Sequence, residues 1–346
     1  MLRRPLLYLL LLLLLNAALS ASAQNTPSHQ INIRPTRFIA TAAIPDFDPI
    51  PASEVVKADT FSGIIYKDLE LSGFFTRPDN LKIVNDVHRS DVRSGKIDFQ
   101  EWIRTGASFV LKSTYSLTGN DLWAECHLYE VRSGQRIFAR KFTGFTRADH
   151  RRMCHLIADE IIRYVAHEPG IASTRIVFVS QRGQAKELFI MDADGQNQRP
   201  LTQDGNLAAT PCWGYKGEEV YYTSYREHNP DLWVVRLADN KAGVISSQAG
   251  FNLSPSWCEK NGRIALTLSK DGNSEIYTMD RRGGGLKRLT FHKAIDAAPS
   301  WSPDGSRIIF TSDRGGSPQL YMMDSEGLNI RRITHQGSYN ESAVWS

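Results

Sequence analysis

The amino-acid sequence predicts a β-propeller preceded by a small α/β domain, and three observations support this prediction. Tryptophans recur every 44 residues, at Trp213, Trp257, Trp301 and Trp345. Apolar, aromatic and threonine positions keep the same interval, and Pro/Gly turns separate short β-type runs. Residues before about 169 show no such repeat. A period of about 40 to 45 residues with a tryptophan and several short strands is typical of a propeller blade.

The clearest repeat predicts four short antiparallel strands. Strand A carries Trp301 and leads into the turn 302–305, where proline and glycine supply the turn dihedrals. Strand B covers 308–311 and strand C covers 320–323, and a tight turn leads to strand D, which ends at Ile333–Thr334. Radial packing of four-stranded antiparallel blades protects edges that a lone sheet would expose.

The first and last units differ from the others. Pro169–Gly170 stands where a tryptophan strand is due, so the first unit supplies only strands B, C and D, over 176–202. The chain ends at Trp345–Ser346, where another blade begins. We expect a propeller of the six-bladed type that is incomplete here, truncated at its C-terminus, with about two further repeats needed for closure. An open solenoid is the alternative, and its unpaired edge disfavours it.

The pattern of residues 24–168 predicts the α/β domain. A β-type run covers 37–44, a helix over 53–72 has Ser53 as N-cap and stops at Gly73, and a short helix contains Trp102. Three hairpin strands (108–117, 122–131 and 135–143) precede a final helix over 147–166. We expect the helices on one side of a mixed sheet.

The first 23 residues predict a secretory signal peptide, which leaves 24–168 and 169–346 as the two domains. Arg3 and Arg4 precede the apolar run Leu6–Leu15, which is too short to span a bilayer, and Ala21–Ala23 is a small-residue cleavage site. An uncleaved anchor is the alternative. The polar stretch 24–30 is expected to be mobile, and no later apolar run has membrane length, so the mature chain is not expected to span a membrane.

Charge and cysteine usage narrow the class of protein. The formal net charge is only +4, without a basic patch, so nucleic acid is not an expected partner. Export permits disulfides. Because no close pairing and no CxxC are visible, buried free thiols are favoured for the four cysteines, Cys126, Cys154, Cys212 and Cys258.

The sequence contains no constellation that supports catalysis. GxSxG and HExxH are absent. His150 and His155 lie five residues apart, which does not place both on one helical face, so two exposed helix residues are predicted rather than metal ligands. Asp192–Gly195 resembles the start of a calcium loop, but the later ligands are missing and a strand C-to-D turn is favoured. We predict no catalytic residue, no cofactor and no metal.

Binding is expected at one end of the propeller. Antiparallel strands place the D-to-A and B-to-C loops at the same end, and these loops are longer and more varied than the turns at the other end. Binding residues gather on such loops because a rigid scaffold positions them. We name this end the loop rim; it comprises 203–210, 226–230, 248–254, 291–298, 314–318 and 335–342. Candidate aromatic anchors for a protein partner, with ordinary loop packing as the alternative, are Phe251, Phe291, His292 and Tyr339.

The signal peptide, the α/β domain and the Trp-Ser-Pro-Asp-Gly repeat together resemble the TolB family, the exported propeller proteins of the Tol–Pal envelope system. Trp301–Gly305 matches the repeat closely, whereas the stretches from Trp213 and from Trp257 depart from it, and Trp102–Ala107 before a β run is also similar. The resemblance implies a six-bladed, non-catalytic propeller protein in the periplasm that supports outer-membrane integrity and cell division. A monomer is expected.

The resemblance also implies two partners. The loop rim would bind Pal, a peptidoglycan-associated outer-membrane lipoprotein. Matching the loops before each Pro-x-Trp element assigns this contact to Phe251, Asn252, Ser254, Ala297 and Ala298, although these residues depart from the polar, His-containing family pattern. The mature N-terminus would bind TolA of the inner-membrane complex, through Gln24, Asn25, Thr26, Ile31 and Ile33.

Two other functions stay open at this point. The propeller could be the gating half of an exported serine peptidase whose catalytic domain is missing, because the tryptophan repeat is shared with peptidase propellers. It could also be a glycan-binding propeller, because aromatic side chains are placed on its loops.

Overall fold

The computed structural model describes residues 39–51, 53–57 and 60–345. The predicted signal peptide and the predicted N-terminal partner segment lie outside the described residues. Among the described helices, none combines the length and the apolar character needed to cross a membrane.

The first domain contains a mixed sheet, as expected. Strand β1 (Ala40–Ala43) pairs in parallel with β3 (Phe75–Thr76) and with β4 (Phe109–Thr118). Strand β4 continues antiparallel through β5 (Asp121–Glu130) to β6 (Arg136–Thr146), and the short β2 (Asp48–Pro49) pairs with the far end of β4. The three predicted hairpin strands are therefore confirmed.

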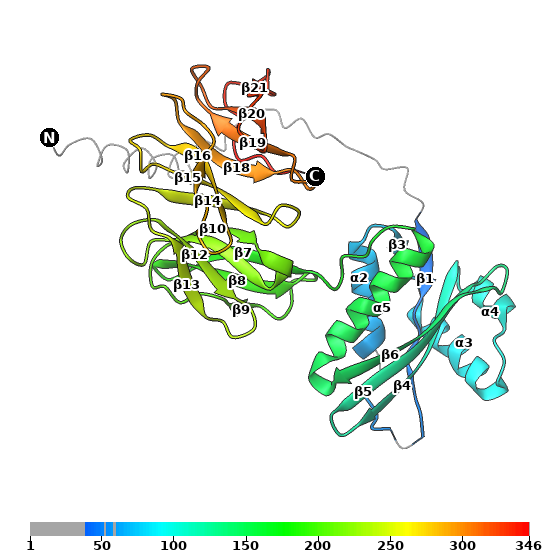
Figure 1. Ribbon diagram of the computed structural model, residues 1–346. Coiled ribbons are helices and arrows are strands. Elements are labelled where there is room, and N and C mark those ends of the chain that lie inside the picture. Colours follow the sequence, from blue (N-terminus) through cyan, green and yellow to red (C-terminus); the bar gives the residue numbers. More distant parts are fainter. Residues whose placement is uncertain (1–38, 52, 58–59, 346) are drawn as a thin grey trace. The chain divides into compact units, whose positions relative to one another are not determined.

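The helices cover both faces of this sheet, so the expectation of helices on one side is wrong. Helices α2 (Thr60–Leu71) and α5 (His150–Val165) pack together on one face, in a core shared with Leu111 and Leu128. Helices α3 (Leu81–Ser94) and α4 (Phe99–Arg104) lie on the other face, where a second core surrounds Trp102 (Figure 1). Successive strand residues point to opposite faces, so one sheet can support both cores.

Two details of the helices differ from the predictions. Helix α2 begins at Thr60, and Ser53 is not its N-cap: the Ser53 hydroxyl instead accepts the Leu117 N–H at 2.9 Å, which ties this segment to β4. Helix α3 is absent from the prediction because its buried stripe is largely polar. His88 and Asp91 lie on that stripe, and Asp91 accepts the Trp102 indole N–H at 2.7 Å.

The second domain begins with a three-stranded sheet of β7 (Arg175–Arg182), β8 (Ala185–Asp192) and β9 (Arg199–Pro200). Three four-stranded antiparallel sheets follow, which confirms the predicted blades. Their strands are β10 (Ala208–Trp213), β11 (Glu219–Ser224), β12 (Asp231–Arg236) and β13 (Ala242–Ser246); β14 (Asn252–Cys258), β15 (Arg263–Leu268), β16 (Glu275–Asp280) and β17 (Lys287–Arg288); and β18 (Asp296–Trp301), β19 (Arg307–Ser312), β20 (Gln319–Asp324) and β21 (Arg331–Arg332). Because α5 ends at Val165 and β7 begins at Arg175, we propose residue 168 as the domain boundary.

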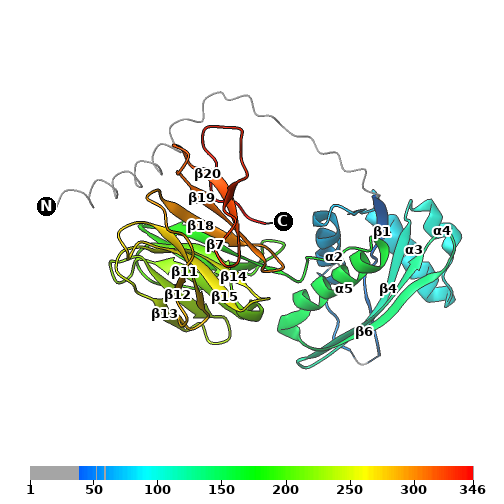
Figure 2. The ribbon, with the colours of Figure 1, turned by 45° about the horizontal axis from the view of Figure 1, so that its top comes forward.

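Equivalent bonds join neighbouring sheets. The backbone N–H of Trp257 lies 3.3 Å from the Cys212 sulfur, and that of Trp301 donates to the Ser256 hydroxyl at 3.1 Å. The Trp345 indole N–H donates to the carbonyl of Ser300 at 3.1 Å. The first strands β10, β14 and β18 accordingly lie side by side (Figure 1), and the sheets follow one another in chain order (Figure 2).

All four cysteines are free thiols, as favoured from the sequence. Three are buried, and Cys212 is half-buried between two sheets. Burial raises the pKa of the Cys126 thiol to about 12, so this sulfur stays protonated and unreactive at neutral pH.

Candidate functional site

The loops of the rim meet at one end of the propeller, as the antiparallel order requires. The Asn252 N–H donates to the carbonyl of Pro230 at 2.9 Å, and the Asn340 N–H donates to that of Pro318, also at 2.9 Å. Each bond links a D-to-A loop to a B-to-C loop. At the other end, the Ser325 N–H donates to the carbonyl of Ser306 at 3.0 Å and links the short turns.

Buried side chains hold the rim loops in place. Asn252, the first residue of β14, is fully buried, and its carbonyl oxygen accepts from the Ser246 hydroxyl at 2.7 Å and from the Gln248 N–H at 3.0 Å. Its amide lies 3.4 Å from Asp231 Oδ1. One repeat later, the Asn340 amide donates to Gln319 Oε1 at 3.0 Å. The rim is therefore a preorganised surface rather than a set of loose loops.

A strained backbone position recurs on the first strand of each four-stranded sheet, and again at the equivalent position after β21. Thr210, Ser254, Ala298 and Ser342 all have φ between 47° and 55°, in the left-handed region that residues with a β-carbon seldom adopt. The strand register shifts at the first three of them, which marks a β-bulge. Backbone strain of this kind gathers at binding sites, where the surrounding structure enforces it.

The structure brings the five residues predicted to bind Pal to this strained region. Ser254 and Ala298 are the left-handed residues themselves, and Ala297 precedes one of them. Phe251 is half-buried beside Asn252, whose side chain is fully buried and engaged within the chain. Asn252 can therefore position the loop but cannot contact a partner through its side chain.

The other aromatic candidates differ in exposure. Phe291 is 74% exposed and Tyr339 is 48% exposed, so both are available to a partner. The His292 ring is half-buried, and its Nδ1 lies 3.0 Å from the backbone nitrogen of Ala294. The residues predicted to bind TolA (Gln24, Asn25, Thr26, Ile31 and Ile33) lie outside the described part of the chain.

A second cluster of charged residues joins α5 and α2 to the first propeller sheet. The carboxylate of Asp194 is buried in the turn after β8 and accepts a hydrogen bond from the Arg151 guanidinium. Lys67 of α2 donates to the Asp194 carbonyl at 2.8 Å. Burial alone would raise the pKa of Asp194, but the Gln196 N–H and Arg151 outweigh it and hold the pKa below its ordinary value. The sequence prediction of a turn at Asp192–Gly195 is confirmed, and this turn also carries the contact with α5.

His155 belongs to this cluster, so the prediction of an exposed residue is wrong. The ring is 3% exposed, and its Nδ1 lies 2.6 Å from Asp68 Oδ2. Burial opposes protonation, but the hydrogen bond to Asp68 and the charges of Asp68 and Asp194 outweigh it and raise the pKa of His155. His150 is half-buried, and its Nδ1 lies 3.0 Å from the Arg147 carbonyl oxygen.

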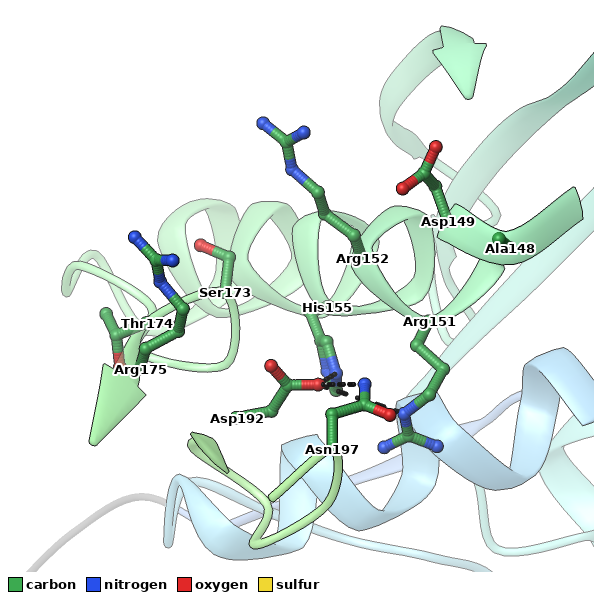
Figure 3. Close-up of a pocket in the computed structure, with 10 residues that line it drawn as sticks. All are labelled: Ala148, Asp149, Arg151, Arg152, His155, Ser173, Thr174, Arg175, Asp192 and Asn197. Carbon is green, nitrogen blue, oxygen red and sulfur yellow. Dashed lines mark hydrogen bonds and ion pairs between the residues drawn. The ribbon is translucent and has the colours of Figure 1, made fainter. Parts of the chain in front are cut away.

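A polar cavity of about 470 Å³ opens beside this cluster. Figure 3 shows His155, Asp192, Asn197 and Arg151 converging on one side of α5, whereas Arg152 extends away from them. Ser173 and Thr174 also line the cavity, but among the described residues no hydroxyl or thiol is hydrogen-bonded to His155. The cavity therefore lacks the aligned nucleophile and base that acyl transfer requires.

Asp68, His155 and Asp194 could in principle hold a metal ion, since one ligand atom of each lies within 4.8 Å of the others. Their charges are already engaged by cationic groups of the chain. Arg151 and Lys67 bind Asp194, and Asp68 pairs with His155. This arrangement fits an internal charge network better than a metal site, because an ion would have to displace those partners.

Comparison with protein families decides the identity of the fold. Residues 163–346 match the family described as TolB beta propeller domain, and residues 30–137 match the family described as TolB amino-terminal domain. The chain belongs to the TolB family. The expected fold, an α/β domain followed by propeller blades, is thereby confirmed.

Individual relatives of this TolB-family chain agree. The Tol-Pal system protein TolB of Anaeromyxobacter sp. (strain K) is 35% identical over an alignment of 232 residues, which covers 64% of this chain and 52% of that protein. The protein of the same name from Desulfosudis oleivorans is 31% identical over an alignment of 255 residues, which covers 72% of this chain and 56% of that protein. The chain thus spans about half the length of these relatives.

A solved structure supports the same arrangement. The crystal structure of TolB from Acinetobacter baumannii superposes with a TM-score of 0.74 at 27% identity, covering 88% of this chain and 74% of that one. Because the overlap includes most of the chain, both domains of this TolB-family member share the fold of that protein.

Sequence reasoning missed the charged cluster, although a signal existed. Arg151, His155, Ala158 and Ile162 follow the helical spacing of one face, and the last two are fully buried. A histidine in line with buried apolar residues is expected to be buried as well, and it then needs a polar partner. Asp68, on another helix, could not be matched to it from spacing alone.

Proposed function

We propose that this TolB-family chain is a non-catalytic periplasmic interaction protein of the Tol–Pal system. The relatives that support this role carry the name Tol-Pal system protein TolB. In this proposal the loop rim holds the Pal lipoprotein, and the N-terminal segment from Gln24 to Ile33 reaches TolA. The chain would thereby link the inner-membrane complex to the outer membrane and support envelope integrity and division.

The preorganised rim is the observation that supports this role most directly. A partner that docks on fixed loops does not have to order them, so less of the binding free energy is lost. The left-handed residues Ser254 and Ala298 and the buried Asn252 provide this fixation. Phe251, Phe291 and Tyr339 are aromatic side chains on the rim that can bury apolar area against Pal, and Ile295 is a further exposed apolar one.

Calorimetric titration of the chain with the soluble domain of Pal tests the rim. Ala298→Glu should weaken binding at least about tenfold, because it places a charge in the centre of the interface. Phe251→Ala and Phe291→Ala should each weaken it by about two- to tenfold through lost apolar contact. The control is Ser306→Glu, a change of the same charge in a turn at the opposite end, which should leave the affinity unchanged.

Two outcomes would count against the rim as the Pal site. Either the rim variants bind like the parent chain, or Ser306→Glu weakens binding as much as Ala298→Glu. Circular dichroism of each variant separates lost folding from lost contact.

The TolA contact needs a separate test. Removal of residues 24–33 should abolish capture of the TolA periplasmic domain and leave Pal binding in place. Alanine substitution of Ile31 and Ile33 tests the same segment with a smaller change. TolA binding that survives both changes would exclude this segment as the contact.

A further inference from the structure

A pair of buried carboxylates lies under the loop rim between the third and fourth sheets. Glu275 begins β16 and Asp296 begins β18, and both are 0% exposed. The Asp296 N–H donates to the carbonyl of Ser274 at 2.9 Å, which brings the starts of these two strands together. Among the described residues, Glu275 Oε2 and Asp296 Oδ1 have no hydrogen-bond partner.

The repeats show what normally occupies these two positions. In the preceding sheet they are Asp231 and Asn252, whose side chains lie 3.4 Å apart. In the following one they are Gln319 and Asn340, joined by a hydrogen bond of 3.0 Å. Both of these pairs contain an amide that supplies an N–H donor, whereas Glu275 and Asp296 supply a donor only when one of them is protonated.

The two neighbouring arginines do not supply a hydrogen-bond donor to the unpaired oxygens of Glu275 and Asp296. Arg288 lies 2.9 Å from Glu275 Oε1, and Arg314 lies 2.6 Å from Asp296 Oδ2, so each guanidinium engages one oxygen of its acid and leaves the other free. Arg288 is shared with Asp271 at 3.5 Å. Burial raises the pKa of Asp296, the Ser312 hydroxyl and Arg314 lower it, and the charge of Glu275 raises it again, with a net rise.

Other polar groups beside the pair are already engaged. Asp313 accepts the Ile295 N–H at 2.8 Å, and Asp271 bonds Tyr277 and Lys270. The His292 ring nitrogen lies 3.0 Å from the Ala294 nitrogen. The Ser312 hydroxyl bonds Asp296, but among the described residues no group donates to Glu275 Oε2 or to Asp296 Oδ1.

We propose that Glu275 and Asp296 share one proton and that this proton makes the loop rim sensitive to pH. Glu275 also accepts the His292 N–H at 2.8 Å, and Asp296 immediately precedes Ala297 and Ala298. Loss of the proton sets two anionic oxygens against each other in a dry site and loosens the loop 291–298. The effect on partner binding rests on the proposed function; the effect on folding does not.

The sign of the pH dependence follows from the bound proton. Between the ordinary carboxyl pKa of about 4 and the higher value in the folded chain, the native state holds about one more proton than the unfolded state. Stability is therefore greatest at the acidic end of this range and falls as the pH rises through the folded-state value.

Urea unfolding of the chain from about pH 4.5 to about pH 8 tests the shared proton. In Asp296→Asn, the number of protons released on unfolding should fall by about one, so the unfolding free energy should depend less on pH. The variant should fold, because asparagine stands at the equivalent positions 252 and 340. The matched control is Asp231→Asn, where the pair already contains an amide, and it should keep the pH dependence of the parent chain.

Three results would overturn the proposal. The unfolding free energy of Asp296→Asn could depend on pH as steeply as that of the parent chain. Alternatively, Asp231→Asn could weaken the pH dependence as much as Asp296→Asn does. Magnesium or calcium chloride could stabilise the parent chain and not Asp296→Asn, which would place a cation, rather than a proton, between the two oxygens.

Pal titrations at both ends of the pH range test the link to the partner site. The parent chain should bind about fivefold more weakly at the higher pH, and Asp296→Asn should lose this difference. Binding at both pH values with no difference between the two proteins would break the link to the rim. Absence of any Pal binding would contradict the proposed function, while the unfolding result would still decide the shared proton.

Discussion

Arg151 donates a hydrogen bond to the buried carboxylate of Asp194 and thereby joins α5 of the first domain to the turn after β8 of the first propeller sheet. Asp194 sits in the turn between strands C and D, where the other repeats use acidic residues for turn geometry. At this first repeat the same chemistry also makes a contact between the domains. The charged cluster around Asp194 is therefore part of what holds them together.

Asp194→Asn tests this contact with little change of shape. Asparagine can still accept the Gln196 N–H that shapes the turn, but it loses the charge that Arg151 and Lys67 meet. We expect a loss of about 1.5–3 kcal/mol in the free energy of unfolding, the range for hydrogen bonds to charged groups. Urea unfolding measures it. Asp239→Asn, which removes an exposed partner of Arg236, should change stability by less than about 0.5 kcal/mol; equal losses in both variants would argue against a special role for Asp194.

The raised pKa of His155 predicts a pH dependence of its own. A histidine with a folded-state pKa above its unfolded value of 6.5 stabilises the fold fully below that pH and loses the contribution as the pH rises through the folded-state pKa. We therefore expect stability to decline above about pH 6.5 in the parent chain. His155→Gln should reduce this decline by the contribution of His155 and leave that of Asp296, as read from urea midpoints at several pH values. His150→Gln, on the same helix, should retain the parent profile, and a parent profile that rises with pH in this range would contradict the assignment.

The propeller could be predicted from the sequence because the tryptophan pattern that indicates it is repeated. Four tryptophans at one interval outweigh any single misleading position, and the structure places a four-stranded sheet around each of Trp213, Trp257 and Trp301. Helix α3 gave no such signal, because its buried stripe includes His88 and Asp91, which a search for apolar periodicity passes over. A polar residue buried with its partner looks the same in the sequence as a polar residue in solvent.

The backbone conformation and the buried pairs of the candidate site could not be predicted from the sequence, because they depend on how the strands pack together. Ser254 and Ala298 carry no mark of the left-handed conformation, which glycine or asparagine would have suggested. The aligned repeats show that Glu275 and Asp296 stand where the neighbouring repeats have a pair that contains an amide. The consequence of this difference can be worked out only once both side chains are known to be buried. Pairing across strands is a property of the folded chain.

The strain at Ala298 predicts an unusual response to glycine. Ala298→Gly relieves a left-handed β-carbon conformation that costs about 1–2 kcal/mol, and this gain offsets the larger entropy of the unfolded chain. The variant should be as stable as the parent or more stable by up to about 1 kcal/mol. Ala297→Gly, at the preceding residue of the same strand, should cost about 0.5–1 kcal/mol because it relieves nothing. Thermal and urea unfolding of the two variants decide the matter, and equal destabilisation would mean that position 298 is not strained.

Gly305 and Gly217 occupy the same position two repeats apart, and they predict different costs for the same substitution. Both have positive φ, so alanine strains the backbone at either site by about 1–2 kcal/mol. At Gly217 an added β-carbon meets nothing within 4 Å, whereas at Gly305 it lies 2.8 Å from the Cys258 sulfur, which is buried in the core between two sheets. We expect Gly305→Ala to lose about 1–3 kcal/mol more stability than Gly217→Ala, the usual cost of overpacking. Urea unfolding of both variants measures the difference. Cys258→Ala in the Gly305→Ala background should recover part of it by making room, and a double variant no more stable than Gly305→Ala would show that the sulfur contact is not the cause.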